Sequence, residues 1–169
     1  MTPGIQELMR QIERVWDAYR HAVYVTGDLE AALATTDAMT SVVHLPVGTG
    51  ARDRDGLRRH LAEEVLPNLP ADLTRTRVSR TVDRFRVVDE ERVAFTHDRE
   101  VGWLLPGVGP THRRADVVAI TVATLRQGRI AAQRTLWDHH TLLTQLDLPP
   151  DAVPSGASRE TAEGPAGWW

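Results

Sequence analysis

The chain has 169 residues, no cysteine and a formal net charge of −3. This length predicts a single domain, and the lack of cysteine excludes disulfides, thiol catalysis and thiolate metal sites. The small negative charge gives no sign of a nucleic-acid-binding surface. The basic residues are all arginine, and the sequence has no lysine. No apolar run approaches membrane-spanning length, and the N-terminus lacks the apolar core of a signal peptide. We therefore expect a cytoplasmic protein with no nucleic-acid or membrane partner.

The N-terminal part of the chain predicts helices. Apolar residues recur at helical spacing over 5–25, and Gly27 is placed to end this helix. Asp28 is a favoured cap for a second, shorter helix over 29–35. Trp16 and Tyr19 lie on the apolar face of the first helix, where they either belong to the core or contact a ligand.

A short strand, a loop and a third helix follow. Residues 39–45 predict the strand, with His44 near its end. The next loop has three glycines, but neither the spacing nor the lysine of a phosphate-binding loop. The helix over 56–66 is expected to be capped by Asp53 or Asp55 and stopped by proline.

The chain then changes to β-structure. Long strands are predicted over 73–88, 92–105, 113–126 and 129–137, with short turns at 89–91, 106–110 and 127–128. Turns this short between long strands indicate antiparallel hairpins. Helices followed by a meander predict an α+β fold, in which helices cover one face of a strongly bent antiparallel sheet. Such a cone is expected to hold a pocket between helices and sheet.

The domain is expected to span 1–148. The tail over 149–169 is rich in proline, glycine, alanine and serine, which predicts disorder. Trp168 and Trp169 end this tail and either dock on the body of the protein or a neighbouring subunit, or stay frayed.

The leading chemical candidate is Asp138, which stands where the last strand passes into a closing helix. It is flanked by Trp137 and His139 and followed by an apolar run. At the mouth of an apolar cavity the pKa of this carboxylate would rise, so that it could act as a base or an acid. Alternatively, Asp138 only caps the helix, since aspartate is a favoured N-cap.

Two segments near the C-terminus carry a family resemblance. Gly128-Arg-Ile130, a strand and then Asp138-His-His-Thr-Leu-Leu-Thr-Gln-Leu146 match the pattern Gly-Lys-Ile, strand, Asp-x-x-Gly-Leu-Leu-x-Gln-Leu. Pro110-Thr-His-Arg113 matches Pro-Thr-Gly-Arg. These are features of the SnoaL-like proteins, the polyketide-cyclase branch of the nuclear-transport-factor-like superfamily, which the chain resembles over 5–148. It departs from the pattern at Thr141 and His112, which replace glycine, and at Arg129, which replaces lysine.

The resemblance implies a cone-shaped α+β barrel, commonly dimeric, that acts on a small-molecule substrate without a cofactor. In SnoaL-like cyclases a pocket aspartate is the acid/base of an intramolecular aldol ring closure, and this role would map to Asp138. The superfamily also contains epoxide hydrolases, ketosteroid isomerases and members with no known reaction. Hydrolysis, isomerisation and a non-catalytic ligand-binding or dimerisation role are therefore the alternatives, and a homodimer is expected.

Strand parity assigns further residues to the site. Arg134 shares a face with Asp138, and an arginine there would lower the pKa of the carboxylate unless it pairs elsewhere. Phe95 marks the inner face of its strand, which places His97 inside, as a proton shuttle, a donor to Asp138 or a core histidine. The predicted catalytic residues are thus Asp138 and His97. The predicted substrate contacts are His44, Trp16, Tyr19, Arg134, Trp103, Trp137 and Phe95. The histidine, the tryptophans and the tyrosine have a core alternative, and Arg134 could instead pair with an acid on a neighbouring strand.

A metal site is not predicted. Successive strand residues point to opposite faces, so that at most Asp138 and His140 could share an ion. A third ligand would have to come from His97 or His44, without a repeated spacing.

Overall fold

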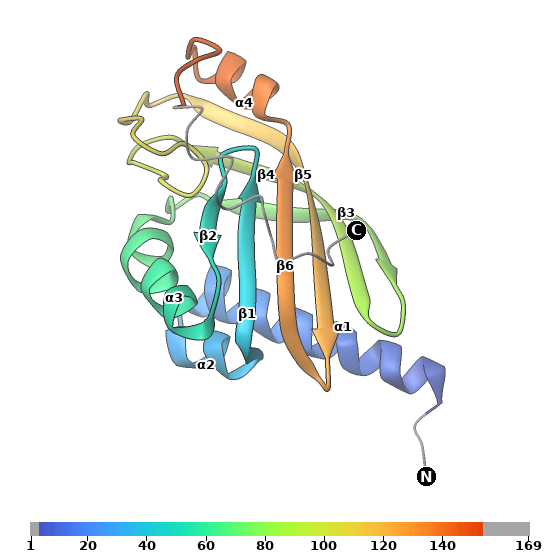
Figure 1. The fold of residues 1–169 in the computed structure, drawn as a ribbon. Coiled ribbons are helices and arrows are strands. Elements are labelled where there is room, and N and C mark those ends of the chain that lie inside the picture. Colours follow the sequence, from blue (N-terminus) through green and yellow to red (C-terminus); the bar gives the residue numbers. More distant parts are fainter. Residues whose placement is uncertain (1–3, 154–169) are drawn as a thin grey trace.

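A computed structural model describes residues 4–153 and has an α+β fold (Figure 1). Six strands form one sheet in the order β2-β1-β6-β5-β4-β3. Their bounds are β1 Thr36–Leu45, β2 Thr49–Ala51, β3 Thr74–Val82, β4 Arg86–Thr96, β5 Arg114–Arg126 and β6 Arg129–Trp137. The β1–β6 pair is parallel and the other pairs are antiparallel. The sheet is curled, as predicted, but it is mixed and leaves β2 and β3 as open edges.

The helices lie against this curled sheet. In Figure 1, α1 crosses behind the strands, α2 and α3 lie beside β1 and β2, and α4 sits at the opposite end. Helix α1 continues into a π-helical turn, η1, and α3 continues into a second, η2, and a 3₁₀ turn, η3. Their bounds are α1 Ile5–His21, η1 Ala22–Thr26, α2 Leu29–Ala34, α3 Arg54–Arg59, η2 His60–Val65, η3 Leu66–Asn68 and α4 His139–Gln145.

Local signals place the helix ends where the sequence predicts them. Gly27 has φ 65°, a left-handed conformation that glycine adopts at little cost and that ends the first helix. The side chain of Asp28 accepts a hydrogen bond from the amide of Ala31 at 2.9 Å. Asp53, rather than Asp55, caps α3 through the amide of Gly56.

The predicted turn at 89–91 is wrong, and its true position determines which side chains of β4 reach the candidate site. The turn lies instead at Asp83, whose Oδ1 accepts from the amides of Phe85 at 2.6 Å and Arg86 at 2.7 Å. An aspartate side chain can stabilise such a turn without glycine or proline. Asp89 and Glu91 therefore lie inside strand β4.

Two bulges change which side chains face the interior. In β3, Arg77 pairs with Glu91 but Ser79 pairs with Glu90, so that Val78 is an extra residue. In β6, pairing with β5 skips Ala131. An extra residue reverses the alternation of side chains beyond it.

The connection over 97–113 has neither helix nor strand, contrary to the strand predicted as far as residue 105. It folds back onto the core and buries Val101, Trp103 and Leu105. The expected tail lies mostly outside the described residues, including Trp168 and Trp169. Within 4–153, no helix has the length and apolar character needed to cross a membrane.

Candidate functional site

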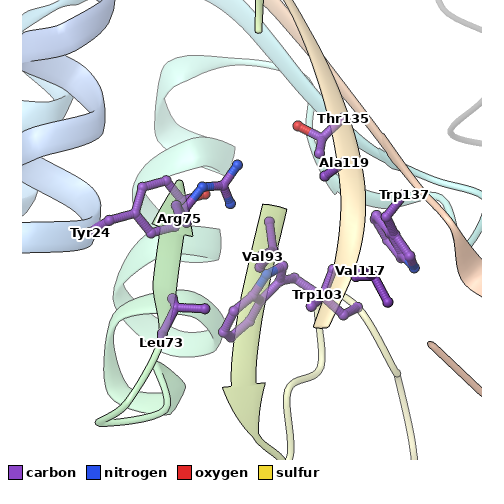
Figure 2. A pocket seen from close by; sticks show the side chains of 10 residues that line it. Tyr24, Leu73, Arg75, Val93, Trp103, Val117, Ala119, Thr135 and Trp137 are labelled. Atoms are coloured by element: carbon purple, nitrogen blue, oxygen red, sulfur yellow. The ribbon is translucent and has the colours of Figure 1, made fainter. Parts of the chain in front are cut away.

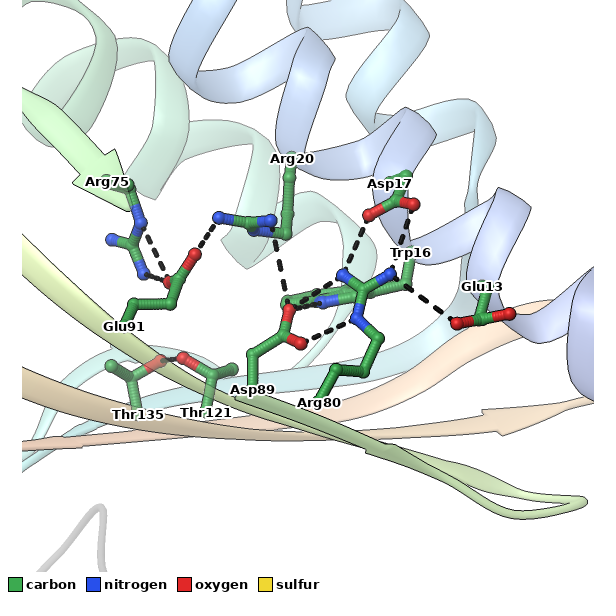
Figure 3. Close-up of polar contacts among 10 residues, drawn as sticks. All are labelled: Glu13, Trp16, Asp17, Arg20, Arg75, Arg80, Asp89, Glu91, Thr121 and Thr135. Carbon is green, nitrogen blue, oxygen red and sulfur yellow. Dashed lines mark hydrogen bonds and ion pairs between the residues drawn. The ribbon is translucent and has the colours of Figure 1, made fainter. Parts of the chain in front are cut away.

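Five polar residues form a continuous row across the concave face of the sheet. Each is the cross-strand neighbour of the next, one from each of five adjacent strands. We call this the inner polar row; its members are His44, Thr135, Thr121, Asp89 and Arg80. Four of them are at most 6% exposed, and the Arg80 side chain is 9% exposed. The row places hydrogen-bonding and charged groups in an otherwise apolar interior, beneath helix α1 (Figure 3).

Asp89 is the centre of the ionic end of this row. Arg80 donates to it from Nε at 2.6 Å and from Nη2 at 2.8 Å, and the indole of Trp16 donates at 2.8 Å. Burial alone would raise the pKa of Asp89, but the hydrogen bonds from Arg80 and Trp16 outweigh it and lower this pKa. Asp89 therefore stays ionised and holds α1 to the sheet.

Glu91 follows Asp89 on the inner face of β4, and two arginines share its carboxylate. Arg75 donates to one of its oxygens from Nε at 3.2 Å and from Nη2 at 2.6 Å, and Arg20 donates to the other oxygen. Burial lowers the pKa of Arg20, and the neighbouring Arg75 adds to this effect. The bulge at Val78 allows both Arg75 and Arg80 to point inward although they are five positions apart.

A pocket opens beside this ionic cluster (Figure 2). The hollow contains about 400 Å³ of empty space, part of it open to solvent, but the centre of a water molecule can reach only about 20 Å³. That narrow part has room for about one water. Its walls are mostly apolar, and the lining residues are Tyr24, Leu73, Arg75, Val93, Trp103, Leu104, Val117, Ala119, Thr135 and Trp137.

Two polar groups stand at the pocket wall on opposite sides. The guanidinium of Arg75 lies 4.4 Å from the centre of the Tyr24 ring, and one edge of this guanidinium donates to Glu91. Thr135 shares a hydrogen bond of 3.0 Å with Thr121. The pocket thus combines aromatic and aliphatic walls with one cation and one hydroxyl.

His44 extends the inner polar row beyond Thr135 and connects it to the surface. Its Nε2 lies 3.4 Å from Nε2 of His60, and Nδ1 of His60 lies 3.0 Å from a carboxylate oxygen of Glu64. Both imidazoles are buried, whereas the Glu64 side chain is 53% exposed. The ring of His44 also lies 6.4 Å from that of Trp137, a residue of the pocket wall.

The hydrogen-bond partners of His44 and His60 determine which of their ring nitrogens carry a hydrogen. Burial lowers the pKa of His44 to about 3, and it lowers the pKa of His60 against the opposing effect of Glu64. Both rings are therefore neutral at neutral pH. Since a carboxylate only accepts, Nδ1 of His60 carries a hydrogen and its Nε2 accepts from His44. The bare nitrogen of His44 is then Nδ1.

The concave sheet, the pocket and the helices that cover them can be compared with known folds. No family model and no curated protein matches the sequence. A Jannaschia sp. CCS1 protein described as a SnoaL-like polyketide cyclase superposes with a TM-score of 0.65 at 18% identity, over 89% of this chain and 98% of that one. This chain has the SnoaL-like fold.

Other solved structures show how varied proteins with the SnoaL-like fold are. IdmH from Streptomyces antibioticus, described as a polyketide cyclase, is 22% identical with a TM-score of 0.57, over 84% of this chain and 99% of its own. A Mycobacterium tuberculosis protein described as an LEH-like epoxide hydrolase is 15% identical with a TM-score of 0.59, over 85% and 92%. The match covers nearly the whole described chain, and at these identities it concerns the fold alone.

Asp138 does not lie in the pocket of this SnoaL-like fold. Its side chain is exposed and caps α4, accepting from the amide of Thr141 at 3.0 Å and from its hydroxyl at 2.7 Å. These two hydrogen bonds lower the pKa of Asp138, in the direction opposite to the one expected for a buried base. The expectation of a raised pKa is wrong, and the alternative interpretation as a helix cap is confirmed.

Arg134 is also on the opposite face from the one that parity predicts. The bulge at Ala131 reverses the alternation of β6, which directs Gln133, Thr135 and Trp137 inward and leaves Arg134 half-buried on the outer side. Sequence parity counted from Ile130 could not include this extra residue. Arg134 therefore does not line the pocket.

His97 and Phe95 are buried on the inner face, as expected, but neither lines the pocket. The two rings meet edge to face with centroids 6.5 Å apart. Nδ1 of His97 accepts from the amide of Thr111 at 3.2 Å, so the hydrogen is on Nε2, which has no partner among the described residues. Burial lowers the pKa of His97. This arrangement matches the core alternative.

The predicted aromatic contacts divide into two groups. Trp103 and Trp137 line the pocket. Trp16 and Tyr19 are buried and stacked with centroids 5.7 Å apart, and Trp16 bonds Asp89, so both belong to the core. Within residues 4–153, no group of three or more histidine and acidic side chains is arranged to hold a metal ion.

The residues that sequence reasoning missed are mostly those of the ionic cluster and of η2. Asp89 and Glu91 continue the period-two pattern of Val87, Val93 and Phe95, so uninterrupted alternation was the available signal. His60 and Glu64 are four residues apart in a helical segment, a spacing that brings side chains together. The remaining missed residues are Arg20, Tyr24, Arg75, Arg80, Thr121 and Thr135.

Proposed function

We propose that the protein is a cofactor-independent acid/base enzyme of the cyclase or isomerase type. Its substrate is a mostly apolar carbonyl compound that enters the pocket between η1, the sheet and the connection over 97–113. His44, rather than Asp138, removes a hydrogen from the carbon next to the carbonyl group; since His44 stands next to the lining residue Trp137 and not in the lining itself, the pocket has to widen at Trp137 for this contact. The observation that supports this most is the neutral His44 beside the pocket wall, linked through His60 to the exposed Glu64.

The link to Glu64 addresses the weakness of His44 as a base. A pKa of about 3 means that the ring is neutral and available, but that holding a proton there is costly. A proton accepted at Nδ1 of His44 can be matched by transfer of the hydrogen on Nε2 to His60, and of the hydrogen on Nδ1 of His60 to Glu64. The positive charge then does not have to remain in the buried ring.

Thr135, next to His44 in the sheet, supplies the polar group for the substrate oxygen. Thr135 is the cross-strand neighbour of His44, and its hydroxyl faces the pocket. Its oxygen accepts from the side-chain amide of Gln133 at 3.5 Å and can accept from the hydroxyl of Thr121 at 3.0 Å. The hydroxyl hydrogen can then be directed to a carbonyl oxygen, which would stabilise negative charge as the neighbouring carbon loses its proton.

Ligand entry requires the pocket to widen, because its narrow part has room for about one water. Trp103 and Leu104 form one wall and come from the connection over 97–113, which has no helix or strand. Movement of this segment would enlarge the pocket without breaking the sheet. The superposed polyketide cyclases and the epoxide hydrolase support small-molecule chemistry in this fold.

Exchange of hydrogen for deuterium next to a carbonyl group tests the proposal without knowledge of the natural substrate. A panel of bicyclic to tetracyclic ketones would be incubated with the protein in D₂O and followed by proton NMR. We expect at least one ketone to exchange faster than in buffer, and His44→Gln to slow this exchange by about 10²–10⁴-fold. The exposed His21→Gln is the matched control. Equal exchange by His44→Gln and the wild type would show that His44 is not the base.

A non-catalytic ligand-binding module is the second candidate. It is favoured by the narrowness of the pocket and by the lack of a carboxylate or imidazole among its lining residues. In that case a ketone would quench tryptophan fluorescence through Trp103 and Trp137, while its exchange rate would equal that in buffer. Asp138 would remain a helix cap under either candidate.

A further inference from the structure

The ionic cluster beside the pocket has a buried part, and the partly exposed carboxylates of Asp17 and Glu13 complete it at the Arg80 end. Its buried members are three guanidinium groups and two carboxylates, with side chains between 0% and 16% exposed. These members are Arg20, Arg75, Arg80, Asp89 and Glu91. A charged group in a buried position is unfavourable unless its hydrogen-bonding groups find partners.

The arginines at the two ends of the cluster differ in the number of carboxylates that they contact. At the far end Arg80 bonds Asp89 and also the 51% exposed Asp17, at 2.8 Å and 3.1 Å. At the pocket end Arg20 and Arg75 share the single carboxylate of Glu91. Arg20 also lies 3.8 Å from Asp89, whereas Arg75, the arginine that lines the pocket, has one oxygen of Glu91 as its carboxylate partner among the described residues.

Donors remain unused at this end. Arg75 directs Nε and Nη2 to one oxygen of Glu91 and stacks its face near Tyr24, which leaves Nη1 without a hydrogen bond to the described residues. Nε of Arg20 is buried and likewise lacks a partner within residues 4–153. Figure 2 shows the Arg75 side chain on the pocket wall beside Tyr24. An arginine held on one edge by a carboxylate is pre-positioned to bind a second anion with the other edge.

We propose that the pocket binds an apolar molecule that carries a carboxylate, and that Arg75 pairs with this carboxylate. The apolar body would lie against Val93, Val117 and Trp103. The inference rests on the proposed function in using the same pocket, and it narrows the substrate from a carbonyl compound to an apolar keto acid. Arg75 would act in binding and orientation, while proton transfer would stay with His44.

A matched ligand pair tests the inference. 2-Naphthylacetic acid and 2-naphthylacetamide have the same apolar body and differ in charge at neutral pH. Binding would be measured by calorimetry at low ionic strength, with quenching of tryptophan fluorescence as a second readout. We expect the acid to bind at least about tenfold more tightly than the amide, and this preference to shrink as salt is added.

Substitution of Arg75 assigns the preference to this side chain. Arg75→Met should weaken binding of the acid to the level of the amide and leave amide binding unchanged, which also shows that the pocket is still folded. Arg75→Lys should keep part of the preference, because the charge remains but the planar fork is lost. The matched control is Arg77→Met, an exposed position on the same strand.

The outcomes separate this inference from the proposed function. Equal binding of acid and amide by the wild type, or an unchanged preference in Arg75→Met, would overturn the carboxylate site while leaving catalysis by His44 intact. If neither compound binds, the carboxylate site is rejected, and the proposed function is then decided by the ketone-exchange test. A clear acid preference without ketone exchange would support the carboxylate site and reject the catalytic role.

Discussion

The inner face of β4 and the start of α4 both place an aspartate next to tryptophan and arginine or histidine, yet the two carboxylates have different environments. Asp89 is fully buried and bonded by Arg80 and Trp16. The carboxylate of Asp138 is exposed, and both of its hydrogen bonds to the described residues come from Thr141 in the first turn of α4. The pKa of each is lowered, but only Asp89 joins parts of the chain that are far apart in sequence. A lowered carboxylate pKa therefore shows that the group has hydrogen-bond donors as partners. Where those donors lie in the sequence decides whether the carboxylate joins distant segments, as Asp89 does, or caps a helix, as Asp138 does.

Of the substitutions that test this comparison, the one at Asp89 is expected to reduce stability most. Asp89→Asn removes the negative charge but leaves Arg80 buried, so the free energy of unfolding should fall by about 3–5 kcal/mol in urea titrations. Glu90→Gln, the adjacent position facing the other side, is the control. The double variant Arg80→Met/Asp89→Leu should recover part of the loss, because it removes both buried charges. A single variant as stable as the wild type would contradict the central role of Asp89.

The next effect concerns pH and the other end of the inner polar row. The ordinary pKa of 6.5 for His44 falls to about 3 in the folded protein. Below the ordinary value the unfolded chain binds a proton that the native protein does not, so stability decreases as pH falls. The slope reaches about 1.4 kcal/mol per pH unit for one such group, and continues until the folded pKa is reached.

Urea titrations between about pH 5 and about pH 7 measure this dependence, in a window where the carboxylates remain ionised. His44→Gln should give a flatter dependence than the wild type. His21→Gln, which removes an exposed histidine, should leave the profile of the wild type unchanged. An identical slope in His44→Gln and the wild type would mean that the buried ring does not govern acid sensitivity.

The smallest effect is expected at Asp138. Asp138→Ala removes the cap of α4, and its loss of stability should be several-fold below that of Asp89→Asn, because the helix is short and solvent replaces the lost bonds. Asp138→Ser, which can still cap, is the control. Thermal unfolding followed by circular dichroism measures both. A large loss, comparable to that of Asp89→Asn, would remove the distinction between the two carboxylates.

The elements with local signals could be predicted from the sequence. Gly27 and Asp28 mark one helix boundary, and the cap interpretation of Asp138 needed only the residues that follow it. The apolar spacing of the helices and the α+β order of the chain also persist in the structure. These signals depend on neighbours within a few residues, which a single sequence displays.

The candidate site could not be predicted in the same way, because it depends on the count of residues between strands. The turn at Asp83 lacks glycine and proline, so the sequence contains no signal for it. The predicted boundary between the two strands therefore fell at 89–91, in the middle of β4. The extra residue Ala131 then placed Arg134 on the wrong face. His44 and the pocket tryptophans Trp103 and Trp137 were found, because their residue types are informative by themselves, but their partners come from distant segments.

The extra residue Val78 has one more consequence, for the solubility of the native protein. Strand β3 is an open edge of the sheet, where unpaired backbone groups could join an edge of another molecule. The bulge interrupts the regular spacing of these groups, and the exposed Arg77 next to it adds charge. The bulge that lets both Arg75 and Arg80 point inward thus also makes this edge of the sheet a poor template for intermolecular β-pairing and aggregation.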